Sequence, residues 1–210
     1  MNGIPSLQTA DSYVSYLSKV TKVDPGRRAA LRRSLGKPVH DIGVRRAHAV
    51  VAPWLPQNED LPGRNVRAAV ESAYYTVAAL VAARPADRDR RQDDEPPSAE
   101  VVPDEGQHKR DNLGRTLGVA VREGKVNADS IEARLHLLCR QDLAGLHRQL
   151  PGLIRQLHAR EVRLDLAKLL IDLSRWADRR DWVVKAWLQQ FYRAMNQNTD
   201  DVTSKESEEK

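Results

Sequence analysis

The residues that could bind a metal or act as a nucleophile are few in this chain and lie close together. Cys139, the single cysteine among 210 residues, is preceded by His136 and followed by His147. Three such ligands could hold a catalytic zinc ion, but His136 and Cys139 lie in an apolar helical pattern, where a lone cysteine is usually a small core residue. We therefore expect no metal site and no cofactor.

The sequence motifs of common enzyme classes are missing. There is no glycine-rich phosphate loop of the form GxxxxGK[ST], no HExxH and no Gly-x-Ser-x-Gly turn. Four carboxylates of the C-terminal half are expected to cap helices or pair with cations: Asp165, Asp172, Asp178 and Asp181. The sequence thus predicts a protein that is not an enzyme.

Arginine is the predominant basic residue, with 25 Arg against 9 Lys. Genomic base composition can raise Arg and Ala together, but it does not explain how the charge is distributed. The net charge is +6 over residues 1–84, −4 over 85–112, +6 over 113–197 and −3 over 198–210. Positive charge is therefore concentrated in the two stretches that have folding patterns, which favours a polyanionic partner.

The densest basic cluster is Arg27-Arg28-Ala29-Ala30-Leu31-Arg32-Arg33-Ser34. Asp24 as N-cap and Pro25 at the first position predict a helix here. Arg28 and Arg32 would be neighbours one turn apart. No acidic residue follows Asp24 in this helix, which favours phosphate contact over a merely solvated face. Other basic residues are Lys37, Arg45, Arg46, Arg64 and Arg67, and in the second half Arg115, Arg122, Lys125, Arg134, Arg140, Arg148 and Arg155.

The elements that must position these cations are predicted to be helices. Ala (24) and Leu (23) dominate the apolar residues, and no stretch shows the alternation of a strand. Trp176 and Trp187 fit the apolar stripes of their helices and are expected in the core. The predicted helices cover 9–22, 25–35, 41–52, 64–83, 112–122, 128–140, 142–157 with an interruption near Pro151, 165–178 and 181–195.

We therefore predict an all-α fold of two small helical bundles, residues 1–84 and 113–197, with a single larger bundle as the alternative. Residues 85–112 are predicted to be a disordered charged linker, and residues 198–210 a disordered acidic tail. No signal peptide or apolar run of membrane-spanning length is present, which predicts a cytoplasmic protein without membrane contact.

Several of these motifs, taken in order, resemble the CasB family, the small subunit of the type I-E CRISPR surveillance complex Cascade. The run from Arg27 to Ser34 resembles the family's N-terminal arginine helix. The resemblance covers most of residues 10–195 and continues through the segments 113–117, 131–138 with Asp142, 164–170, 172–176 and 187–192. Two features depart from the pattern: Leu166 stands where many relatives have Trp, and the 85–111 segment is longer.

This resemblance implies an all-helical subunit without catalytic activity, present in two copies beside the guide RNA and the other Cascade subunits. It implies contacts with the displaced non-target strand and the target strand that stabilise the R-loop in antiviral defence without reading sequence. The implied nucleic-acid contacts are Arg27, Arg28, Arg32, Arg33, Arg115, Arg134 and Arg140, with Arg28, Arg32 and Arg115 foremost.

Two other functions remain open from the sequence. A helical transcriptional regulator would place a recognition helix in the major groove of DNA. A scaffold subunit would use the same arginines against acidic protein surfaces.

Overall fold

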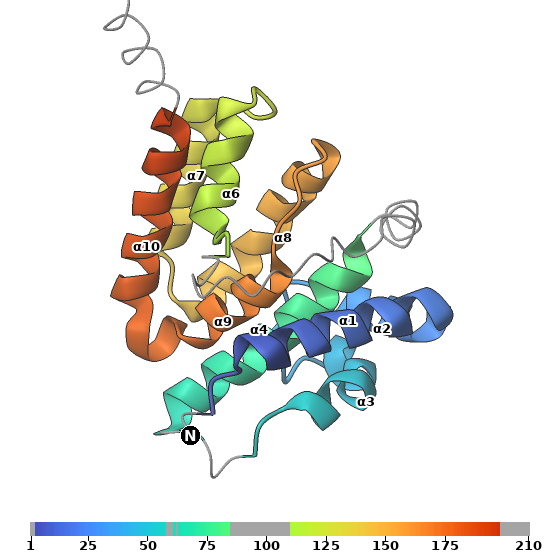
Figure 1. The fold of residues 1–210 in the computed structure, drawn as a ribbon. Coiled ribbons are helices and arrows are strands. Elements are labelled where there is room, and N and C mark those ends of the chain that lie inside the picture. The colour runs from blue at the N-terminus through green and yellow to red at the C-terminus, as the bar shows by residue number, and fades with distance from the viewer. Residues whose placement is uncertain (1–2, 58–60, 62, 85–109, 198–210) are drawn as a thin grey trace, which may run out of the picture. The chain divides into compact units, whose positions relative to one another are not determined.

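The computed structural model describes residues 3–57, 61, 63–84 and 110–197, and its elements are helices, with no strand in these ranges. The all-α prediction is therefore confirmed (Figure 1). None of these helices is both long and apolar enough to cross a lipid bilayer. The α-helices are α1 (Leu7–Val23), α2 (Pro25–Arg33), α3 (His48–Val51), α4 (Gly63–Ala83), α6 (Leu113–Arg122), α7 (Ala128–Arg140), α8 (Leu143–Ala159), α9 (Leu166–Ser174) and α10 (Trp176–Asn196), and two 3₁₀ helices are η1 (Ile42–Ala47) and η2 (Ala52–Trp54).

The helices pack into two compact units that do not follow chain order. The first unit comprises residues 1–110 and 166–178, and the second comprises residues 111–165 and 179–210. The predicted division into 1–84 and 113–197 differs from this one because α9 packs on α1 and α4. The physical reason is that α9 is rich in Leu and is buried on nearly every side, with only Lys168 partly exposed, so it must be surrounded by other helices.

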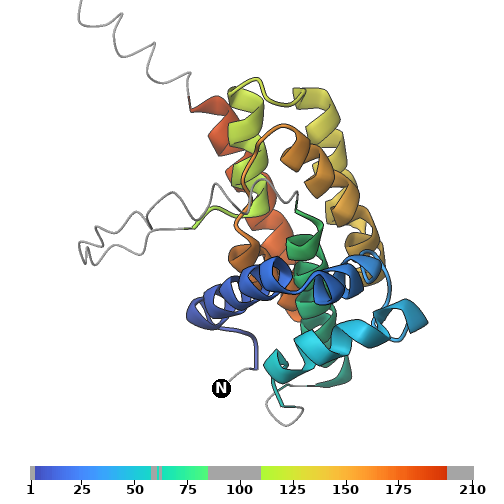
Figure 2. The same ribbon diagram turned by 90° about the vertical axis from the view of Figure 1, so that its right-hand side faces the viewer.

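The core of the first unit is built around α4, which lies against α1, α2 and α9 (Figures 1 and 2). Its second half is almost entirely Ala, Val, Leu and Tyr, and these residues are buried from Ala73 to Ala82 with the exception of Thr76. The Tyr13 hydroxyl of α1 donates a hydrogen bond to the Tyr74 carbonyl over 3.0 Å. This contact attaches α1 to the middle of α4.

The second unit depends on a close approach of α6 and α10. A Cβ atom added at Gly114 would lie 1.8 Å from the Trp187 carbonyl oxygen, and one at Gly118 would lie 2.4 Å from the Phe191 carbonyl oxygen. Trp187 and Phe191 are themselves fully buried, as predicted for Trp187. Only glycine at these two positions of α6 allows the two backbones to pack this closely.

Several predicted helix boundaries are confirmed. The Asp24 carboxylate caps α2 by accepting a hydrogen bond from the Arg27 amide over 2.9 Å. The helix α2 ends at Arg33, two residues before the predicted end, and Gly36 in the turn that follows adopts a φ of 72°, a left-handed conformation that glycine tolerates. The predicted break between residues 178 and 181 corresponds to Arg179, whose φ of −130° and ψ of 25° interrupt α10. The first unit ends at this point.

Three local predictions need correction. The expected helix 41–52 is divided into η1, α3 and η2. Pro151 does not interrupt α8, because it removes a single backbone donor while buried leucines on both sides hold the helix together. Residues 110–112, predicted to belong to the disordered linker, are held in place, because Arg110 pairs with Asp11 over 2.6 Å and Asn112 caps α6. The rest of the predicted linker and the predicted tail lie outside the described residues.

Candidate nucleic-acid interface

Helix α2 presents two arginines to solvent with no partner among the described residues. Ala30 and Leu31 form the buried side of this short helix. Arg32 and Arg33 are exposed at its last turn. Cations there are favourable for the helix, because the C-terminal end of the peptide dipole is negative. These two predicted contacts are therefore available to an external anion.

Arg27 and Arg28 of α2 are engaged within the protein. The Arg27 Nε atom lies 3.2 Å from a carboxylate oxygen of Asp24, and its side chain is about half exposed. The Arg28 Nε atom donates to the Ala82 carbonyl over 3.2 Å, and its Nη2 atom donates to the Arg84 carbonyl. Arg28 thus binds the C-terminal turn of α4, where a cation stabilises unpaired carbonyls. Arg28 therefore helps to hold α2, which carries the exposed arginines, against the end of α4.

Replacing Arg28 should therefore affect stability. We expect Arg28→Ala to lower the free energy of unfolding by about 1–2 kcal/mol, because two carbonyls at the end of α4 lose a charged donor. Amide hydrogen exchange in the last turn of α4 should accelerate. Arg27→Ala is the matched control on the same helix, and it should cost less than about 1 kcal/mol because an exposed ion pair contributes little. Equal effects of the two variants on stability and exchange would contradict this role for Arg28.

The 3₁₀ helix η1 packs beside α2 and adds further cations. Arg45 and Arg46 are exposed and, like Arg32 and Arg33, have no partner among the described residues. We call these four residues the α2–η1 surface. The turn between the two elements is held by Lys37 and Asp41, whose Nζ and carboxylate oxygen lie 3.5 Å apart.

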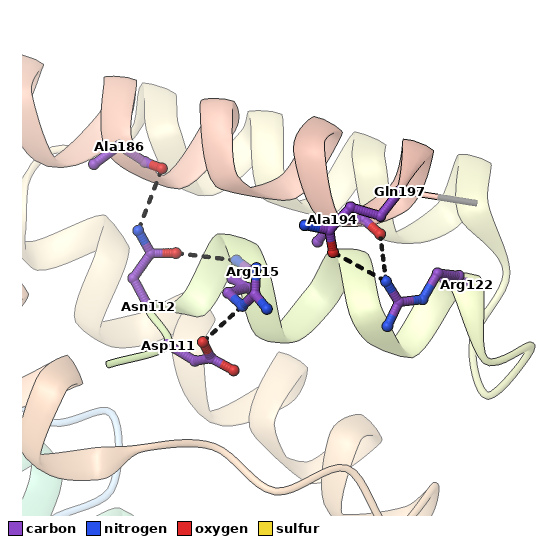
Figure 3. A network of polar contacts seen from close by, with 7 residues as sticks. All are labelled: Asp111, Asn112, Arg115, Arg122, Ala186, Ala194 and Gln197. Atoms are coloured by element: carbon purple, nitrogen blue, oxygen red, sulfur yellow. Dashed lines mark hydrogen bonds and ion pairs between the residues drawn. The ribbon is translucent and has the colours of Figure 1, made fainter. Parts of the chain in front are cut away.

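In the second unit, Arg115 and Arg122 project from α6 and are bound at their ends (Figure 3). The Arg115 Nε atom lies 2.7 Å from a carboxylate oxygen of Asp111. The Arg122 Nη1 atom donates to the Gln197 amide oxygen over 3.1 Å. Asn112 joins the same network, because its side-chain nitrogen donates to the Ala186 carbonyl while its oxygen caps α6. Arg115, about one third exposed, therefore has an internal partner that a phosphate would have to displace.

The remaining predicted contacts lie on α7. Arg134 is exposed, and its Nη1 atom donates to the Gln156 amide oxygen of α8 over 2.7 Å. Arg140, at the C-terminal end of α7, is exposed without a partner in the described part of the chain. The helix α8 contributes Arg148 and Arg155 to its solvent side, and the continuity of α8 through Pro151 preserves their spacing of two turns.

Of the three candidate metal ligands, Cys139 and His147 are buried in the second unit, and His136 is partly exposed. The thiol of Cys139 is buried, and burial raises its pKa to about 11. Burial also lowers the pKa of His147 to about 4, which keeps its imidazole neutral. The His136 Nε2 atom lies 2.9 Å from the Tyr192 hydroxyl, which in turn donates to Glu132. Within the described ranges, no group of three His, Cys, Asp or Glu side chains could hold a metal ion.

The sequence indicated most of these cations but not their internal partners. Asp111 and Arg115 are four residues apart across the start of α6, a spacing that could have revealed their ion pair. The carbonyls that Arg28 binds lie 54 and 56 residues away in sequence, so no local pattern could have identified them. Of the seven predicted residues, the structure leaves Arg32, Arg33 and Arg140 without a partner among the described residues.

Comparison with models of known protein families identifies the family of this chain. The family model for the CRISPR-associated protein Cse2 matches residues 27–192, which begins at the first arginine of α2 and ends in α10. The chain belongs to the Cse2 family. The resemblance to the CasB family inferred from the ordered motifs is confirmed. No protein of curated function matches the sequence.

Solved structures similar to this Cse2-family chain include subunits of large assemblies. A chain of a CRISPR RNA-guided surveillance complex is 36% identical with a TM-score of 0.74, and the match covers 93% of this chain and 98% of that chain. A chain of a pre-nicking CRISPR RNA-guided surveillance complex is 37% identical with a TM-score of 0.76 and the same coverage. The CasB protein of M. ruber, 22% identical with a TM-score of 0.68 over 93% of this chain and 98% of that one, shares the fold.

Proposed function

We propose that this Cse2-family chain is the non-catalytic small subunit of an RNA-guided CRISPR surveillance complex of the Cascade type. In this role it binds nucleic-acid backbone without reading sequence and stabilises the R-loop, including the displaced non-target strand and the target strand. Its partners are the other Cascade subunits, the guide RNA and single-stranded regions of the target DNA. Two copies would be present in each complex.

The observation that supports this function most directly is the α2–η1 surface. Four exposed arginines lie on two adjacent helices, and none has a partner in the part of the chain that the structure describes. The two nearby carboxylates are already bound, Asp24 to Arg27 and Asp41 to the Gly43 amide over 2.7 Å. That amide hydrogen bond is the main cause of a lowered pKa for Asp41, which keeps this group charged and engaged.

Arginine suits this task because its guanidinium presents a fixed fork of donors that matches two phosphate oxygens. Contacts with phosphates position a strand but carry no sequence information. In RNA-guided recognition the sequence is read by base pairing with the guide, so the protein needs only to hold the backbone. The α2–η1 surface meets that requirement. The structural similarity to chains of two CRISPR RNA-guided surveillance complexes supports the same assembly.

Purification of the chain from its own cells under native conditions tests this proposal. We expect a tagged chain to co-purify with a fixed set of proteins and one class of short RNA. A lone homodimer without nucleic acid would contradict the proposal. Specific binding to a duplex operator would instead support a transcriptional regulator, and co-purification with acidic proteins and no RNA would support a scaffold subunit.

A further inference from the structure

The helix α10 carries a tryptophan that lies largely at the protein surface. Trp182 is 53% exposed, whereas Trp176 is 3% and Trp187 is 0% exposed. A half-exposed indole is costly in water, because large apolar side chains are stabilised by burial. The exposed part of the indole offers an aromatic face on which a ligand could stack.

Trp182 begins a stripe of exposed residues along α10. At about 100° per residue, Lys185, Gln189 and Arg193 lie within about 60° of Trp182 around the helix axis. All three are exposed. Val183, Trp187 and other residues of the opposite side are buried. The stripe spans about 16 Å between Trp182 and Arg193, at 1.5 Å per residue.

The α10 stripe, defined as Trp182, Lys185, Gln189 and Arg193, combines an aromatic face with unpaired positive charge. Lys185 and Arg193 have no partner among the described residues, and the stripe contains no carboxylate. Asp181 lies about 100° from Trp182 around the helix but one turn before Lys185, and it forms no ion pair with Lys185 among the described residues. Glu132, which approaches α10 from α7, accepts a hydrogen bond from the Tyr192 hydroxyl over 2.6 Å. The charge of the stripe therefore favours an anionic ligand.

We propose that the α10 stripe binds single-stranded nucleic acid, with one base stacked on Trp182 and the flanking phosphates held by Lys185 and Arg193. This inference rests on the proposed function and adds to it a contact with a base. Stacking on an aromatic side chain beside a basic track is how proteins bind single strands without sequence preference, because every base has a flat face. The amide of Gln189 can donate to either a phosphate or a base.

A protein partner fits the stripe less well. Apolar anchors at protein interfaces lie in desolvated patches from which charged residues are depleted. Here the positions three, seven and eleven residues after Trp182 are a lysine, a glutamine and an arginine. A single strand satisfies the indole and both cations at once.

The test compares two oligonucleotides of equal length, oligo(dT) and a fully abasic strand, on the full chain. Both offer phosphates, but only oligo(dT) offers bases. We expect Trp182→Ala to weaken oligo(dT) binding about tenfold, the loss expected when one stacked base is released. Binding of the abasic strand should not change. Trp182→Phe, which keeps an aromatic face, should restore most of the oligo(dT) affinity.

Two further variants separate this inference from the proposed function. Lys185→Ala combined with Arg193→Ala should weaken both strands, and Arg32→Ala combined with Arg33→Ala should also weaken both. If the double substitution of Arg32 and Arg33 has no effect while Trp182→Ala still removes the preference for bases, the α2–η1 surface is not a binding site, but the α10 stripe is supported as one. Equal loss of both strands in Trp182→Ala, no loss at all, or a change in self-association measured by sedimentation would overturn the stripe as a base-stacking site.

Discussion

Replacing Gly114 by alanine should destabilise the second unit by about 3 kcal/mol or more. The added Cβ atom would lie 1.8 Å from the Trp187 carbonyl oxygen and 2.7 Å from the Trp187 Cα atom. Both atoms belong to the backbone of α10, so no rotamer change can relieve the overlap. Overpacking of a well-packed interior costs about 1–3 kcal/mol when side chains can move, and a backbone contact leaves less room for adjustment. Chemical denaturation monitored by circular dichroism measures the loss.

Gly152→Ala provides the matched control for this prediction. Gly152 also lies inside a helix, α8, but a Cβ atom there meets nothing within 4 Å. Alanine should raise stability at that position by about 0.5–1 kcal/mol, the usual difference from glycine in a helix interior. If Gly114→Ala behaved like Gly152→Ala, the close packing of α6 on α10 would be refuted.

Removing Arg32 and Arg33 together should weaken the binding of single-stranded nucleic acid roughly 100-fold at low salt. Each guanidinium is expected to contribute about 1.5 kcal/mol through charge-assisted contact with a phosphate. The fold should remain intact, because both side chains are exposed without a partner among the described residues and lose only a weak interaction with the helix dipole. Fluorescence anisotropy with a labelled oligonucleotide measures the affinity, and the thermal midpoint of unfolding checks that the fold is intact.

Lys19→Ala is the comparison for this double variant. Lys19 is an exposed cation of α1 with no partner in the described ranges, so its removal lowers the general positive charge without touching the α2–η1 surface. We expect a loss of about twofold or less, since a distant charge acts only through a screened field. If Arg32→Ala and Arg33→Ala each reduced affinity no more than Lys19→Ala does, general attraction rather than local contact would explain the binding.

The local signals in the sequence were sufficient for much of the fold. Asp24 and Pro25 identify the start of α2 because capping depends on residues within one turn. The burial of Trp187 follows from the apolar stripe of its helix. The placement of α9 in the first unit could not be predicted in the same way. Helical periodicity describes one element at a time and does not specify which neighbours a helix buried on nearly every side will contact.

At the candidate interface, too, local sequence patterns did not specify the tertiary contacts. The sequence identified Arg32 and Arg33 correctly as cations without a local acidic partner, and the structure leaves both exposed. It placed Arg28 foremost together with Arg32 and Arg115, because a helical pattern does not show which arginine of α2 reaches another helix. Only the tertiary structure shows that Arg28 reaches the end of α4. For the same reason Trp182 could not be separated from the core tryptophans, since exposure depends on which helices pack around α10.

We expect arginines of this chain to neutralise the phosphates of a nucleic-acid strand. The affinity of the full chain for a single-stranded oligonucleotide, measured as a function of salt concentration, tests this expectation. If about six phosphates are neutralised, log K should fall linearly with log[salt] with a slope of roughly −4, because each contact releases a fraction of a condensed counterion. Arg32→Ala with Arg33→Ala should reduce the slope by about 1.4. An affinity that does not depend on salt, and that both substitutions leave unchanged, would show that these arginines do not bind phosphates.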